Sequence, residues 1–113
     1  MASYVPRRGD IIWLTFDPQA GHKQAGRRPA FVASPHPYNK KVGLVLVCPI
    51  TSQIKGYPFE VRVISKSGIN GAILLDQVNS MDWKARKAEF VEAADKNLVA
   101  AVTARILPLI ESS

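Results

Sequence analysis

The stretch IIWLTFDPQAGHKQAGRRPAFVA, residues 11–33, decides the fold of this chain. Its two apolar ends, residues 11–16 and 30–33, are rich in β-branched and aromatic side chains and are predicted to be strands. The segment between them, residues 21–29, carries three cations, one histidine and two glycines but no carboxylate. A tight cationic loop held between two strands is suited to binding phosphate.

The pattern outside this stretch predicts a small antiparallel barrel. Turn residues recur every ten to fifteen positions and no βαβ alternation appears, which is typical of such a barrel with a terminal helix. In residues 59–64, Phe59, Val61 and Val63 alternate with polar or exposed positions, as in a strand with one wet face. The further predicted strands are residues 44–48, expected to be buried on both faces, 59–64, 71–76 and 88–93.

One helix is predicted after the last strand. Asp95 is a plausible N-cap for a helix from Lys96, and Leu98, Val102, Ile106 and Leu109 would form one apolar stripe. Pro108 is expected to end or bend this helix. Residues 35–39, with His36, are interpreted as a connector.

Length and charge define the class of protein. The 113 residues are predicted to form a single domain, residues 1–113, with 47% hydrophobic and 21% charged residues. The net charge of +6 lies entirely in residues 1–56, which hold eight lysines and arginines against two acids. Such a basic face favours nucleic acid or an acidic protein as partner.

Cysteine content and hydropathy indicate the compartment. Cys48 is the single cysteine and lies in an apolar run, so it is expected to be a buried thiol in a reducing cytoplasm. No apolar signal core precedes the domain, and no apolar stretch approaches the roughly 20 residues of a membrane span. The sequence therefore predicts a cytoplasmic protein without a membrane segment.

Two kinds of phosphate site are excluded by the loop itself. Gly21 and Gly26 have the spacing of a P-loop, but Arg27 and Arg28 replace its Lys-Ser/Thr pair and a proline and a strand follow, so an NTPase is rejected. No histidine, cysteine or acid stands at metal-ligand spacing. No metal and no cofactor are therefore expected. Metal-free RNA cleavage would use the 2′-OH as nucleophile and cations to stabilise the phosphorane, and arginine suits the second role.

Several short motifs occur in a fixed order and together resemble the MazF/PemK family of toxin endoribonucleases. The similarity runs from about residue 4 to residue 110. The motifs are Gly9-Asp10-Ile11-Ile12-Trp13, Phe16-Asp17-Pro18, residues 21–29, Pro49-Ile50-Thr51-Ser52, Lys55-Gly56-Tyr57-Pro58-Phe59, Asp76-Gln77-Val78 and Trp83-Lys84-Ala85-Arg86.

The resemblance implies a fold, an activity and partners. The fold would be mainly β, an SH3-like, partly open antiparallel barrel with a C-terminal helix, assembled as a homodimer. The activity would be metal-independent, sequence-specific cleavage of single-stranded RNA, including mRNA, to a 2′,3′-cyclic phosphate and a 5′-OH, which inhibits translation and growth. A cognate antitoxin with an acidic segment would cover the site, and DNA would be bound only indirectly through the toxin–antitoxin complex.

The resemblance also assigns catalytic residues. Arg28 matches the catalytic arginine of the family and Thr51 its catalytic threonine. From the residues alone, Thr51 also fits an ordinary polar turn after a buried strand. Threonine is too weak an acid to act as a base alone, so Thr51 is expected to orient or donate to the phosphate. His22 matches a histidine of the PemK-like branch and is expected to assist in proton transfer.

The predicted RNA-binding residues surround this pair. Asp76 and Gln77 are base-contacting or structural, since an arginine of the PemK-like branch is Leu74 here. Arg86 either contacts phosphate or pairs with an acid such as Asp82. Lys23 stands where many relatives carry glutamate and should make RNA binding more salt-sensitive. Tyr57 is an aromatic residue that either stacks on a base or belongs to the core. The remaining predicted RNA-binding residues are Gln24, Arg27 and Ser52.

Two other functions fit the same pattern. The first is a non-enzymatic toxin of this barrel type that binds and poisons a topoisomerase, and the second is a plain nucleic-acid- or peptide-binding barrel. Arg28 paired with Thr51 favours the nuclease, since a pure binder has no reason to keep both.

Overall fold

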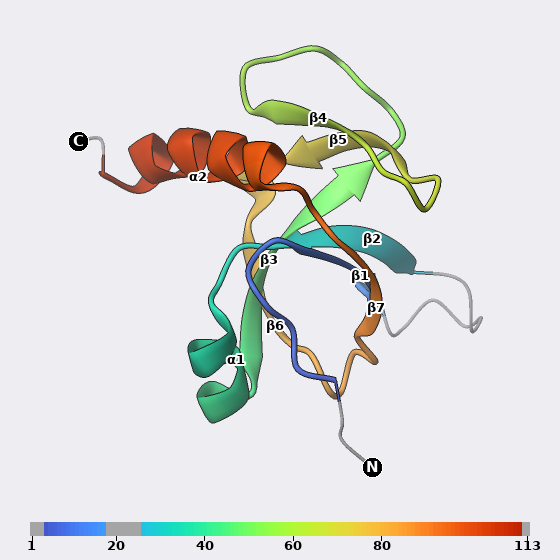
Figure 1. Cartoon of the computed structure of the whole chain (residues 1–113), viewed down its shortest axis with the longest axis vertical. Coiled ribbons are helices and arrows are strands. Elements are labelled where there is room, and N and C mark those ends of the chain that lie inside the picture. The colour runs from blue at the N-terminus through green and yellow to red at the C-terminus, as the bar shows by residue number, and fades with distance from the viewer. Residues whose placement is uncertain (1–3, 18–25, 112–113) are drawn as a thin grey trace.

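A computed structural model of the chain, which describes residues 4–17 and 26–111, is built around one antiparallel sheet (Figure 1). The strands follow the order β4-β5-β3-β2-β1-β7, and β6 pairs with β3 beside this path. The elements in chain order are β1 (Asp10–Thr15), β2 (Arg27–Val32), α1 (His36–Val42), β3 (Leu44–Thr51), β4 (Glu60–Ile64), β5 (Asn70–Leu74), the 3₁₀ turn η1 (Leu75–Gln77), β6 (Asn79–Asp82), β7 (Glu89–Ala93) and α2 (Lys96–Glu111).

The predicted fold class, mainly β with a C-terminal helix, is confirmed. The long strand β3 organises it: its second half pairs with β2 on one side and its last residues, Ile50 and Thr51, pair with β5 on the other. The first half of β3 pairs with β6. Because β3 spans both parts of the sheet, its C-terminal end is held between β2 and the β4–β5 hairpin, where Thr51 lies.

The central strands β1, β2 and β3 are largely buried on both faces. Alternate residues of β1, β2 and β3 enter two separate cores, as the period of two in a strand requires. One core contains Ile11, Phe31 and Cys48 and is covered by the β4–β5 hairpin and α2. The other contains Ile12, Val32 and Val47 and includes Trp83. Burial of β3 on both faces is thus confirmed except at Leu46, which is 38% exposed.

Two elements were not predicted. Residues 36–42 form a short helix, α1, where the sequence indicated a connector. Buried Asn39 holds it, because its Nδ2 donates to the carbonyls of Pro6 and Ser34 and its own carbonyl accepts from Trp83 Nε1 at 2.9 Å. Strand β6 is short and polar, and its pairing with β3 defines it. Both α1 and β6 are stabilised by tertiary contacts, which the local sequence does not reveal.

The predicted face of β4 is wrong at its first residues. Phe59 is 39% exposed, whereas the side chain of Glu60 is buried. The Glu60 carboxylate accepts the backbone N–H groups of Lys55 and Gly56, the latter at 2.8 Å. A buried carboxylate with these partners is satisfied, and it holds the β3–β4 loop against the sheet.

Helix α2 begins where the sequence predicts but does not end at Pro108. The Asp95 carboxylate accepts the Leu98 N–H at 2.8 Å, and Val102 and Ile106 are buried. Pro108 removes an N–H from the last turn, and the helix nevertheless continues to Glu111. Leu109, expected on the apolar stripe, is 38% exposed. None of the helices in the described residues is long and apolar enough to cross a membrane.

Replacing Asp95 with alanine is expected to destabilise the protein by about 1 kcal/mol, because the capping bond to Leu98 is lost. Urea unfolding measures this difference. Asp95→Asn keeps an acceptor at the same place and should recover most of the loss. Equal losses in both variants would show that the charge of Asp95, and not its capping bond, is what matters.

Candidate active site

A cavity of about 700 Å³ opens where β2, the end of β3, the β4–β5 turn and β7 meet. It brings together four of the predicted site residues, which form two adjacent pairs more than twenty positions apart in the chain. These four are Arg27, Arg28, Thr51 and Ser52; the other lining residues are Trp13, Pro29, Ile50, Gln53, Ser67, Gly68, Ile69, Asn70 and Val91. Among the residues that the structure describes, this lining contains two arginines and no carboxylate.

Arg28 is the arginine of this cavity whose guanidinium is available to bind a ligand. It lies in β2 opposite Leu14 and is exposed. Its guanidinium has no hydrogen-bond or ion-pair partner in the part of the chain that the structure describes. A planar fork of donors beside a cavity without carboxylates is suited to a phosphate group.

Thr51 is the last residue of β3 and is half-buried at the same cavity. Its hydroxyl oxygen accepts the backbone N–H of Gln53 at 3.1 Å, so the turn role indicated by the sequence is real. A hydroxyl carries one donor besides its acceptor positions. No acceptor for the Thr51 O–H is found among the described residues, so it can donate to a phosphate oxygen, and the two interpretations of this residue are compatible.

A second hollow of about 110 Å³ adjoins the first, and Thr51 and Gln53 border both. Tyr57 and Gln77, two of the predicted RNA-binding residues, line it, together with Lys55, Glu60 and Leu74. The Tyr57 hydroxyl donates to Asp76 at 3.4 Å. Loss of hydration, followed by the neighbouring Asp76 carboxylate, raises the pKa of Tyr57. Tyr57 also packs edge-on against Phe59 at 6.3 Å between ring centroids, so it belongs to the wall of the hollow and not to the core.

Arg86 has partners other than the two considered from the sequence. Its guanidinium donates to the backbone carbonyls of Thr15 and Phe16, at 3.2 and 2.7 Å. The Asp82 carboxylate instead accepts the N–H groups of Lys84 and Ala85. Pairing of Arg86 with Asp82 is therefore wrong, and a contact of Arg86 with phosphate stays a prediction.

The predicted residues His22, Lys23 and Gln24 lie outside the described residues. The base of their loop is described, and there the Phe16 N–H donates to the Gly26 carbonyl at 2.7 Å. Gly26 has φ +82°, and a Cβ there would lie 2.5 Å from the Asp17 carbonyl oxygen. Only glycine fits this close return of the chain, which delivers Arg28 to its place two residues later.

Sequence reasoning missed the residues that the β4–β5 turn and Gln53 bring to the cavity. The distance of this turn from Thr51 depends on the pairing of β5 with the end of β3, which the sequence does not show. Trp13 lines the same cavity and is 37% exposed.

Groups that hold metals are not gathered in the described part of the chain. Residues 4–17 and 26–111 contain no cluster of three or more His, Cys, Asp or Glu side chains placed to hold an ion. Cys48 is buried as predicted, and burial raises the pKa of its thiol to about 12.

Glu92 ties the β4–β5 turn to β7, and its variant should show a pH-dependent effect. Its carboxylate accepts the Ser67 N–H at 2.8 Å, and hydrogen bonding from the Ser67 side chain is the main cause that lowers its pKa. A lowered pKa means that this contribution to stability is present above the ordinary pKa and lost as the pH falls through the folded value. Glu92→Gln should therefore be less stable than wild type at pH 7, with the gap closing below about pH 4.

Thermal unfolding from pH 3 to 7 measures this gap, with Glu111→Gln as the control because Glu111 lies exposed at the end of α2. A gap between Glu92→Gln and wild type that stays constant over this range would contradict the account.

Comparisons with known proteins identify the family of the chain. A family model described as "PemK-like, MazF-like toxin of type II toxin-antitoxin system" matches residues 7–110. The chain is 53% identical over 88 residues to the endoribonuclease toxin MazF of Escherichia coli (strain K12), covering 78% of each protein. It is 37% identical over 109 residues to the endoribonuclease toxin ChpB of the same strain, covering 92% of this chain and 93% of ChpB.

Solved structures of MazF proteins indicate the same family. The crystal structure of MazF from Deinococcus radiodurans superposes with a TM-score of 0.84 at 46% identity and covers 96% of this chain and 98% of that one. A MazE–MazF crystal structure from the same organism gives 0.86 at 44% identity, covering 97% of this chain and all of the matched chain. The resemblance indicated by the ordered motifs is confirmed, and the chain belongs to the PemK-like, MazF-like family of toxins of type II toxin–antitoxin systems.

Proposed function

We propose that this chain is an endoribonuclease that cleaves single-stranded RNA, including mRNA, at a short sequence without a metal ion. The observation that carries the proposal is the convergence of Arg28 and Thr51, from β2 and β3, on one cavity whose described lining residues include no carboxylate. The names of the E. coli relatives support the same activity.

The chemistry assigned to the cavity is an internal phosphoryl transfer. The ribose 2′-oxygen forms a bond to phosphorus and loses its proton, the bond from phosphorus to the 5′-oxygen breaks, and the 5′-oxygen gains a proton. The products are a 2′,3′-cyclic phosphate and a 5′-OH. Arg28 would donate two hydrogen bonds to the phosphorane oxygens, where charge develops, while the Thr51 O–H orients one of them. His22 is the candidate for proton transfer.

The proposed partners follow from charge and from the family. A cavity with arginines and no carboxylates attracts an acidic peptide as well as RNA, so a cognate acidic antitoxin would compete with RNA for it. The MazE–MazF crystal structures support an antitoxin as partner. We propose that the chain acts as a homodimer in the cytoplasm and meets DNA only through the toxin–antitoxin complex.

The purified protein, incubated with a long single-stranded RNA in EDTA, tests this function against its alternative. We expect defined fragments, and the cut positions mapped along the RNA would give the cleavage sequence. Intact RNA at high protein concentration, together with inhibition of a topoisomerase in a DNA relaxation assay, would favour the non-enzymatic toxin instead.

A further inference from the structure

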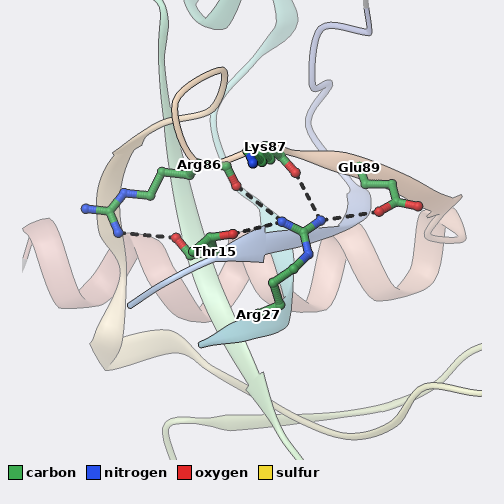
Figure 2. Close-up of polar contacts among 5 residues, drawn as sticks. All are labelled: Thr15, Arg27, Arg86, Lys87 and Glu89. Carbon is green, nitrogen blue, oxygen red and sulfur yellow. Dashed lines mark hydrogen bonds and ion pairs between the residues drawn. The ribbon is translucent and has the colours of Figure 1, made fainter. Parts of the chain in front are cut away.

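A polar network at the base of the β1–β2 loop engages Arg27, the neighbour of Arg28 (Figure 2). Arg27 Nη1 donates to the Thr15 hydroxyl at 2.9 Å and to the Arg86 carbonyl at 3.5 Å. Its Nη2 donates to the Lys87 carbonyl at 3.0 Å and lies 3.3 Å from a Glu89 carboxylate oxygen. Both terminal nitrogens of Arg27 are therefore occupied by partners within the chain, in contrast to those of Arg28.

Arg86 completes the network from the other side. Its side chain donates to the carbonyls of Thr15 and Phe16, while its own carbonyl accepts both from Arg27 and, at 3.0 Å, from the Thr15 N–H. The end of β1, the start of β2 and residues 86–89 are thereby joined through two arginines. This junction lies directly beside the Phe16–Gly26 bond that closes the loop.

The backbone of Lys87 shows how tightly the junction is set. Lys87 has φ 55°, a left-handed conformation that a residue with a side chain rarely adopts. Such a conformation persists where surrounding contacts over-determine it. Here the Lys87 carbonyl accepts from Arg27, and the Lys87 N–H donates to the Lys84 carbonyl at 3.1 Å. Arg27 thus helps to hold a strained turn in place.

The contacts of Arg27 differ in how much they contribute to the stability of the junction. The side chain of Glu89 is 71% exposed, whereas that of Arg27 is 19% exposed. An ion pair with a solvated partner contributes little. The bonds of Arg27 to the Thr15 hydroxyl and to the Arg86 carbonyl are part-buried, whereas those to Lys87 and Glu89 are exposed, so the first two contribute most to the junction.

We infer that Arg27 is a positioning residue for the proposed RNA cleavage and not an RNA ligand. Arg27 and Arg28 both border the cavity, but the terminal nitrogens of Arg27 are bonded within the chain, whereas the Arg28 guanidinium has no partner among the described residues. Anchoring Arg27 to β1 and to residues 86–89 fixes the strand from which Arg28 reaches the cavity. It also fixes the base of the loop that carries His22 and Lys23. This inference rests on the proposed function.

Three measurements on Arg27→Gln distinguish a positioning residue from a phosphate ligand and from a purely structural residue. The first is the single-turnover cleavage rate at saturating protein, well below the melting temperature. The second is the salt dependence of binding to an RNA whose 2′-OH at the cut site is replaced by hydrogen. The third is hydrogen exchange at the Thr15 and Phe16 amides.

We expect Arg27→Gln to lower the cleavage rate by about 10- to 100-fold, because small misplacement of a catalytic group has effects of this size. The slope of log binding constant against log salt should stay as in wild type. In Arg28→Gln the slope should fall by about 0.7, as for one phosphate contact to a single strand. Exchange at Thr15 and Phe16 should accelerate. Arg27→Lys should recover part of the rate, and Glu89→Gln should stay within about twofold of wild type.

Arg8→Gln is the matched control, since it also removes one cation and one bond to a carbonyl, that of Ala33, away from the cavity. Its cleavage rate should equal that of wild type.

A slope lowered by about 0.7 in Arg27→Gln would show that Arg27 contacts phosphate. An unchanged rate with only a lower melting temperature would show a structural role alone; either result overturns the inference. If wild type cleaves no RNA, the proposed function fails, while the exchange measurement still decides whether Arg27 holds the junction.

Discussion

Replacing Arg28 with alanine is expected to lower the rate of RNA cleavage by about 10²- to 10³-fold. The guanidinium is exposed at the cavity and has no partner among the described residues, so its removal breaks no contact that holds the fold. Stability should therefore change by no more than about 0.5 kcal/mol. A single-turnover assay measures the rate, and urea unfolding of the same preparation measures the stability.

Two control variants separate the role of the Arg28 guanidinium from that of its charge alone. Arg28→Lys keeps the charge but loses the planar fork, and we expect an intermediate rate because a lysine cannot bind phosphate bidentately. Arg8→Ala removes one cation far from the cavity and should cleave as fast as wild type. Equal losses in Arg28→Ala and Arg8→Ala would mean that net charge alone matters. A large loss of stability in Arg28→Ala would mean that the arginine supports the fold.

Replacing Gly71 with alanine is expected to destabilise the protein by about 2–3 kcal/mol. A Cβ at this position would lie 2.1 Å from the carbonyl oxygen of Thr51 and 3.3 Å from Ile50 Cγ2. The first obstacle is backbone, which cannot turn aside as a side chain can, so β5 and the end of β3 must separate. Because Thr51 lies on the strand that moves, cleavage should also slow at temperatures where the variant remains folded.

Gly43→Ala is the control for this loss. Gly43 follows α1 at φ 80°, and a Cβ there meets nothing within 4 Å. Its cost should be about 1 kcal/mol, the strain of a left-handed alanine, with normal cleavage. Urea unfolding of both variants measures the difference. Equal destabilisation by the two substitutions would contradict the close approach of Gly71 to Thr51.

The strands could be predicted from the sequence because their signals are local. Residues 11–16 and 30–33 have the composition of strands, and β1 and β2 lie there. The start of α2 was likewise marked by a capping residue. By contrast, α1 depends on buried Asn39, whose side-chain amide donates to the distant Pro6 carbonyl and whose backbone carbonyl accepts from Trp83. Phe59 is exposed and Glu60 is buried, the reverse of the prediction, for a similar reason: the Glu60 carboxylate is held by bonds to the β3–β4 loop.

The candidate site could be predicted in part. The resemblance gave Arg28 and Thr51, and the structure places both at one cavity. The different environments of Arg27 and Arg28 could not be predicted, because the strand was expected to begin at residue 30 and both arginines were assigned to the loop. Both side chains border the cavity, and the bonds of Arg27 to Thr15, Arg86 and Lys87 distinguish them, which only the folded chain reveals.

The most direct test of the account is cleavage, in EDTA, of a short RNA that contains one mapped cut site, compared with the same RNA carrying a 2′-deoxynucleotide immediately before that site. The account predicts that the all-ribose RNA yields a 2′,3′-cyclic phosphate and a 5′-OH, identified by mass spectrometry. It also predicts that the 2′-deoxy RNA is bound but stays intact, since the nucleophile is missing. Cleavage of the 2′-deoxy RNA at a similar rate, or products with a 3′-OH and a 5′-phosphate, would contradict it.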